Sequence, residues 1–206
     1  MARANPGRAN DAPRDAVQLL KQDHRNVEAL IAAFEDADDE ELSSLAERIC
    51  NMLTVHAQIE EEILYPAAKE ALSEDEEEAE LVSEAEVEHA TAKELIAKIE
   101  AMTPDNEAFK ATVKVLCEYV KHHVKEEENE LFPALKESEL DLKEIGARLA
   151  DRKFALMDQM GLEEPEIPTQ RKRSTASRSK SASRGRQARA GARSKSARSS
   201  GRAARH

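Results

Sequence analysis

Six residues of this sequence have the types and the spacing of metal ligands: His24, His56, Glu60, His89, His123 and Glu127. Two of the four histidines are followed by a glutamate four residues later. Four residues correspond to about one helical turn, so each His-Glu pair can project from one face of a helix. Imidazole nitrogens and carboxylate oxygens both bind first-row metals in proteins. The pattern therefore indicates a metal site with mixed nitrogen and oxygen ligands.

The four histidines also lie in phase with apolar residues. In the first segment, steps of three and four residues give the stripe Val17, Leu20, His24, Val27, Ile31 and Phe34. The other three histidines interrupt equivalent stripes, so each predicted helix directs one imidazole inward. A single histidine in such a stripe is more often a core residue, but four in register favour ligands. Two buried carboxylates would each need a compensating cation, and six ligands suit two metal ions better than one.

An internal repeat relates the two His-Glu pairs. The segment 56–70 reappears 67 residues later as 123–137, with the shared pattern HxxxEExxLΦPAxKE, in which Φ is aromatic. His24 and His89 are each followed by five residues and then by Leu-Ile-Ala-x-Φ-Glu, where Φ is Phe34 or Ile99. The sequence therefore predicts a duplicated helical hairpin with a pseudo-twofold axis.

The elements that must position these residues are helices. Apolar periodicity predicts four long helices and a shorter fifth one, at residues 13–35, 40–72, 74–102, 104–136 and 141–160. We expect Asp11 to cap the first helix, with Pro13 in its first turn. Ser73 and Glu76 form a capping-box pattern before the third helix. Thr103 is expected to cap the fourth, with Pro104 at its first position.

The short connections favour an all-α fold, an antiparallel up-down-up-down four-helix bundle with a short extra C-terminal helix and a disordered basic tail. The predicted organisation is a flexible N-terminus (1–12), the bundle (13–138), an accessory helix (139–164) and a disordered tail rich in Arg, Lys, Ser and Ala (165–206). Cys50 and Cys117 are too few for a disulfide framework, so we expect two reduced core thiols.

The net charge of -11 combines two opposed segments. Residues 171–206 contain 13 Lys or Arg and no acidic residue, which leaves residues 1–170 with a net charge of -24. A basic tail of this kind could bind nucleic acid non-specifically, or it could fold back on the acidic body or only aid solubility. Without a signal peptide or an apolar run of membrane-spanning length, we predict a cytoplasmic protein with no membrane partner.

From about Ala16 to Glu137, the two copies of HxxxE followed by aromatic-proline, with one histidine on each of the other helices, resemble the hemerythrin-like, or HHE cation-binding, family. The resemblance implies a four-helix bundle with a non-haem di-iron centre whose carboxylates bridge the metals. It also implies two half-sites, one with His24, His56 and Glu60 and the other with His89, His123 and Glu127.

The sequence departs from the oxygen-carrying hemerythrins, which have a second histidine one turn from the first on the third helix. The positions four before and four after His89 are Ala85 and Lys93 here, and Glu86 is a candidate oxygen ligand. We therefore expect a non-haem di-iron protein that binds or senses oxygen, nitric oxide, peroxide or iron, rather than an enzyme. Zinc or manganese remain alternative metals. The alternative functions are a di-iron peroxidase or oxidase, and a metal-binding stress protein that docks on nucleic acid.

Overall fold

The computed structural model describes residues 15–162, and the predicted N-terminal segment 1–12 and tail 165–206 lie outside them. The all-helical prediction is confirmed in this part, where no strand occurs. The α-helices are α1 (Ala16–Asp36), α2 (Leu42–Ile59), α3 (Tyr65–Ala71), α4 (Glu76–Glu100), α5 (Phe109–Glu126), α6 (Phe132–Glu137) and α7 (Leu142–Met160). Two π-helical turns, η1 (Glu60–Leu64) and η2 (Glu127–Leu131), join α2 to α3 and α5 to α6.

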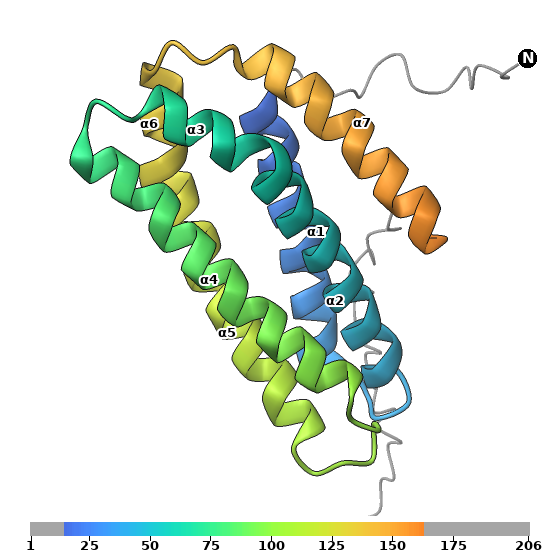
Figure 1. Cartoon of the computed structure of the whole chain (residues 1–206). Helices are drawn as coiled ribbons and strands as arrows, with labels where there is room; N and C mark the ends of the chain where they lie inside the picture. Colours follow the sequence, from blue (N-terminus) through green and yellow to red (C-terminus); the bar gives the residue numbers. More distant parts are fainter. Residues whose placement is uncertain (1–14, 163–206) are drawn as a thin grey trace, which may run out of the picture. The chain divides into compact units, whose positions relative to one another are not determined.

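The helices form four long segments that lie side by side (Figure 1). α1 packs on α2, and α4 packs on α5; α2 also contacts α4, and α1 contacts α5. The last helix, α7, lies against α1 and α2. Among the described residues, no helix is both long enough and apolar enough to cross a membrane.

The π turns interrupt two helices that periodicity predicts as continuous. Each turn lies immediately before the aromatic-proline pair of the repeat, with Pro66 after η1 and Pro133 after η2. Proline has no N–H, and its ring would collide with the carbonyl four residues earlier in a regular helix. The N–H of Tyr65 instead donates to the carbonyl of Glu60, five residues back. The prolines were the signal for this wider turn, and both turns begin at a predicted ligand.

Three helices begin later than predicted, and two of the predicted caps are wrong. The first helix begins at Ala16, capped by Asp15, whose carboxylate accepts the Gln18 N–H at 2.8 Å. The proposed cap Asp11 and first-turn residue Pro13 lie outside the described residues.

The third helix is capped by Asp75 instead of Ser73, because the Asp75 carboxylate accepts two N–H groups of the first turn. The Ser73 hydroxyl donates to the Glu70 carbonyl, so the predicted capping box does not form.

The fourth helix begins at Phe109, several residues after the predicted start at Thr103 and Pro104. Its N-cap, Ala108, makes no side-chain cap. Between the predicted and the observed start, the Thr103 carbonyl accepts the Asn106 N–H, and the Asn106 side chain accepts the Ala108 N–H. These turn bonds occupy the groups that an earlier helix start would use.

The core consists of two hydrophobic clusters on either side of a polar layer. One cluster includes Leu20 and Ile59, and the other includes Val27 and Leu53. Because His24 lies between Leu20 and Val27 on α1, the polar layer lies within the core. Both cysteines are free and buried in the second cluster.

Candidate metal centre

The six predicted ligand residues meet in this polar layer. All six residues are buried, with at most 6% of their surface exposed. They come from α1 (His24), α2 (His56), η1 (Glu60), α4 (His89), α5 (His123) and η2 (Glu127). Six buried polar residues from both hairpins therefore share one centre, as the repeat required.

The ligand atoms fall into two groups. The first group is His24, His56, Glu60 and Glu127; the second group is Glu60, His89 and His123. Within each group, one ligand atom per residue lies within 4.8 Å of all the others. Glu60 belongs to both groups, because its Oε2 is 3.1 Å from His56 Nε2 and 3.4 Å from His89 Nε2.

This grouping differs from the two half-sites that the family resemblance implied. Glu127 lies with the first group, where its Oε2 is 3.2 Å from His24 Nε2. The same oxygen is 3.9 Å from His123 Nε2, in the second group. Both glutamates therefore face histidines of both hairpins, Glu60 closely on both sides and Glu127 closely only on the side of His24.

Each imidazole has a carboxylate at its outer nitrogen, Nδ1. The pairs are His24 with Glu128 at 3.0 Å, His56 with Asp23 at 3.8 Å, His89 with Glu61 at 3.2 Å, and His123 with Glu88 at 2.7 Å. A carboxylate at Nδ1 favours the tautomer that keeps its proton there and leaves the lone pair of Nε2 free. The four Nε2 atoms are thus oriented for a metal.

Sequence reasoning missed these four carboxylates. In each copy of the repeat, one precedes a ligand histidine and the other follows a ligand glutamate. Neighbouring residues on a helix point about 100° apart, so helical phase places each of them off the inward-facing stripe. Every one contacts an imidazole of a facing helix, and the duplicated acidic positions were the signal that could have found them.

Several buried polar atoms of the site have no hydrogen-bond partner. Five of them face the centre, namely His24 Nε2, His56 Nε2, both oxygens of Glu60 and Glu127 Oε2, and the sixth is His56 Nδ1, which faces Asp23. Some of these atoms lie close to one another, such as His24 Nε2 and Glu127 Oε2 at 3.2 Å, but they do not have hydrogen-bond geometry. Unpaired buried polar atoms are rare and costly in proteins, and bound cations would satisfy this set. The residues present therefore fit metal ions as a resident group.

The two inner carboxyls respond differently to this environment. Burial, together with the charge of Glu127, raises the pKa of Glu60 well above its ordinary value. Burial also acts on Glu127, but the nearby imidazoles of His24 and His123 outweigh it and lower its pKa to about 2. Without a metal, Glu60 is therefore the more readily protonated of the two carboxyls.

The histidines also differ from one another. Burial lowers the pKa of His56, and it lowers the pKa of His89 to about 3 with help from neighbouring imidazoles. Burial opposes protonation of His123 as well, but the hydrogen bond and charge of Glu88 raise its pKa. His123 is therefore more readily protonated than either of the other two.

Tyr65 is a further residue that the sequence analysis did not single out. Its side chain is fully buried, and its hydroxyl lies 3.1 Å from His89 Nε2 and 3.4 Å from Glu127 Oε1. Burial and the inner glutamates raise the pKa of this phenol well above its ordinary value. Its counterpart in the second copy is Phe132, which stacks on the His24 ring with centroids 5.8 Å apart.

Glu86, the candidate additional ligand, belongs to neither group. Its carboxylate forms an ion pair with Lys69 at 2.7 Å, and its side chain is 43% exposed. His122 is exposed and contacts Glu126 at 3.0 Å. With Glu88 these two residues form a third, partly exposed group of ligand types.

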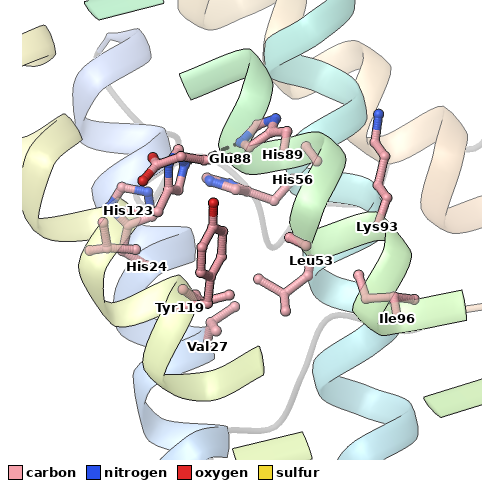
Figure 2. A pocket seen from close by; sticks show the side chains of 14 residues that line it. His24, Val27, Leu53, His56, Glu88, His89, Lys93, Ile96, Tyr119 and His123 are labelled. Carbon is pink, nitrogen blue, oxygen red and sulfur yellow. Dashed lines mark hydrogen bonds and ion pairs between the residues drawn. The ribbon is translucent and has the colours of Figure 1, made fainter. Parts of the chain in front are cut away.

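A cavity adjoins the imidazoles on the side of the second hydrophobic cluster (Figure 2). Its volume is about 30 Å³, and a water molecule needs roughly 10–15 Å³ on this measure. The cavity walls include apolar residues such as Val27 and Leu53. Figure 2 shows the Tyr119 hydroxyl pointing toward the imidazoles. The cavity can therefore hold a small molecule next to the ligand nitrogens.

Residues 15–135 match the model of the Hemerythrin HHE cation binding domain. The chain therefore belongs to this family of cation-binding domains, and its own His/Glu groups are suited to hold metal. Its fold is similar to a crystal structure of a Hemerythrin HHE cation binding domain-containing protein from Mycobacterium kansasii. The TM-score is 0.60 at 21% identity, with 70% of this chain and 88% of that chain covered.

A curated relative is a DNA nickase of Nostoc sp. (strain PCC 7120 / SAG 25.82 / UTEX 2576). The two sequences are 30% identical over 119 residues, which is 57% of this chain and 32% of the relative. The match thus spans about a third of the relative's length.

Proposed function

We propose that this protein is a non-haem di-iron protein that binds or senses a small ligand: oxygen, nitric oxide, peroxide or iron itself. The two irons would be held by His24, His56, Glu60, His89, His123 and Glu127. The observation that carries the proposal is the set of buried Nε2 and carboxylate atoms that lack hydrogen-bond partners, while every Nδ1 faces a carboxylate. Bound iron would supply an open coordination position for the ligand.

The fold that we propose for this function is an antiparallel up-down-up-down four-helix bundle of residues 13–138. The neighbour relations support it, because each long segment contacts two others in a closed ring. The accessory helix 139–164 and a disordered tail 165–206 would follow. We also keep the prediction of a cytoplasmic protein.

The surroundings of the centre favour ligand binding over simple storage. The cavity beside the imidazoles has room for a diatomic molecule and apolar walls that would limit side reactions with water. The Tyr119 hydroxyl is oriented to donate a hydrogen bond to a ligand held there. Four imidazoles, rather than five, would give a harder iron site than that of the oxygen carriers.

The direct test is metal analysis of the full chain together with absorption spectra before and after exposure to air. We expect two irons per chain, one for each ligand group, and near-ultraviolet charge-transfer absorption in the oxidised state. Iron-replete protein that retains no iron would overturn the proposal. Zinc or manganese in its place would keep the site but exclude iron chemistry.

The same preparations test the enzymatic alternative, a di-iron peroxidase or oxidase. Peroxide turnover that disappears in His56→Ala and Glu127→Ala variants with intact helicity would support it. A loaded chain that binds peroxide without turnover would support a binding or sensing role.

A second candidate function is docking on nucleic acid. The name of the Nostoc relative and the 13 basic residues of segment 171–206 favour it. Contacts with phosphates would release counterions, so binding should weaken steeply with salt and show no base specificity. The full chain and a chain ending at Glu164 should differ in salt-dependent binding to duplex DNA. Equal binding by both would remove this candidate.

A further inference from the structure

Helix α7 lies beyond the family match, which ends at residue 135, yet it contacts the first hairpin beside the metal centre. Its main neighbours are α1, α2 and η1. Arg152 forms a two-point ion pair with Glu62 of η1, at 2.5 Å and 2.9 Å. η1 is the turn that carries Glu60. One face of α7 is therefore attached to a segment that provides a ligand.

Gly146 allows α7 to approach α1 very closely. A Cβ atom at this position would lie 2.6 Å from the Ala16 nitrogen and 2.7 Å from the Asp15 carbonyl carbon, inside the contact distance of backbone atoms. Any larger residue would push the two helices apart. The close approach of α7 is thus built into the sequence.

The second attachment leads directly to a ligand. The Lys153 ammonium forms an ion pair with the Asp23 carboxylate, which is 2% exposed, and the Lys153 side chain is itself 17% exposed. The other oxygen of Asp23 lies 3.8 Å from His56 Nδ1. A buried carboxylate needs a positive partner, and Lys153 provides it from α7. The side chains thus form a chain from α7 to the first ligand group.

We propose that Lys153 is a positioning residue of the metal centre. It fixes the Asp23 carboxylate, which in turn holds the His56 ring with Nε2 directed at the first ligand group. The inference rests on the proposed metal-binding function. It makes α7 a part of the centre, although the ligands themselves all lie within the family domain.

The geometry shows why Lys153 is needed. A cavity lined by Asp23, Arg48 and Lys153 adjoins the ion pair. Without the ammonium, the Asp23 carboxylate would turn into that space, which Arg48 also borders, and away from His56. Neither ring nitrogen of His56 has a hydrogen-bond partner, so the ion pair with the Asp23 carboxylate at 3.8 Å is the contact that orients Nδ1.

The test compares Lys153→Met with Lys93→Met in the full iron-loaded chain. Lys93 is the matched control, because it pairs with Glu61, which faces His89 in the second group, but its side chain is 49% exposed. We expect Lys153→Met to release one of the two irons to a chelator about 10- to 100-fold faster, as for loss of other residues that orient a ligand. Lys93→Met should change release only a few-fold, and Lys153→Arg should restore slow release.

Two further measurements keep the result interpretable. In an Asp23→Asn background, which needs no positive partner, adding Lys153→Met should have no further effect. In the metal-free chain, ¹⁵N NMR of His56 should show one tautomer, with the proton on Nδ1, and a mixture in Lys153→Met. Unchanged iron release and an unchanged His56 tautomer would overturn the positioning role. A wild-type chain that takes up no iron would instead overturn the proposed function, and the NMR result would still decide on Lys153.

Discussion

The two ligand groups arise from a duplicated hairpin, but equivalent positions around them carry different chemistry. The aromatic residue of the repeat is Phe132 beside the first group and Tyr65 beside the second. Phe132 covers the His24 ring and offers no polar atom, whereas the Tyr65 hydroxyl contacts His89 Nε2. The two copies of the repeat thus carry the same candidate ligands, while one additional oxygen gives the second group a further polar neighbour.

The carboxylates that face the outer Nδ1 atoms also have different surroundings in the two groups. Asp23, at His56, is buried and paired with Lys153 of α7. Its counterpart Glu88, at His123, lies beside a second carboxylate, Glu126, in a hollow of the surface. The first group is therefore covered by α7 and electrically neutralised, and the second adjoins an acidic, more open surface. We expect the two metal positions to be unequal.

The largest expected effect is that of Glu60→Ala, which should affect both groups alike because Glu60 belongs to both. Glu60→Ala should remove both metal ions, since each group would lose a ligand and the bridge between them would be lost. Glu127→Ala removes a closest ligand only from the first group, so one ion should remain. Metal content per chain, measured after desalting, distinguishes the variants, and circular dichroism must show retained helicity in both. Equal metal loss in the two variants would contradict the unequal grouping.

Gly146→Ala should weaken the difference between the groups by displacing α7. The added methyl meets the Ala16 and Asp15 backbone, which cannot yield as a side chain could. We expect a loss of about 1–3 kcal/mol in the free energy of unfolding, as for other overpacked sites. Thermal melts of metal-free protein measure it. Gly161→Ala, at the C-terminal end of α7, is a poor control because Gly161 has a φ of 65°.

A better control for this prediction is Ala147→Ser, at an exposed neighbouring position of α7. It should leave the melting temperature almost unchanged. If Gly146→Ala is equally neutral, α7 is not held tightly against α1.

The fold was largely predictable from the sequence, because apolar periodicity reports which side of a helix is buried. The stripe containing Val17 and Phe34 is buried as predicted, with His24 among its members. Helix starts were less predictable, since Asp75 and Ser73 are both good caps and only local backbone bonds decide between them. The π turns could be predicted only from Pro66 and Pro133, because the apolar pattern continues through both turns.

The candidate site was predictable as a set of inward-facing residues but not as an arrangement. Helical phase identifies Glu60 and Glu127 as inward, yet their assignment to groups depends on how the two hairpins face each other. Contacts such as Lys153 with Asp23 join residues 130 positions apart. No local pattern encodes such a pair, so the role of α7 appears only in the folded structure.

The unequal histidines predict that acid releases the two metals in order. Metal binding needs neutral imidazoles, and the raised pKa of His123 means that a proton competes there at higher pH than at an ordinary imidazole. His56, in the first group, has a lowered pKa and competes only at lower pH. As the pH falls, the second group should therefore lose its ion first.

Single-group variants make this prediction measurable. His24→Ala should retain the ion of the second group, and His89→Ala should retain that of the first. The midpoint of metal release in a pH titration with a chelator should lie higher for His24→Ala. Coincident midpoints would mean that the metal ions equalise the two groups.

The smallest expected effect is that of removing the Tyr65 hydroxyl, the oxygen atom that distinguishes the second group from the first. Tyr65→Phe gives the second group the aromatic residue that the first already has, and the hydroxyl contacts with His89 and Glu127 are lost. Because Tyr65 faces only part of the centre, we expect both irons to remain, with release of one accelerated by up to about tenfold. Any visible absorption from phenolate-to-iron charge transfer should disappear, whereas Tyr119→Phe should keep it, because the Tyr119 hydroxyl points into the neighbouring cavity. If both variants keep the wild-type spectrum and release rate, the Tyr65 oxygen is a packing feature and the difference between the groups resides in their carboxylates alone.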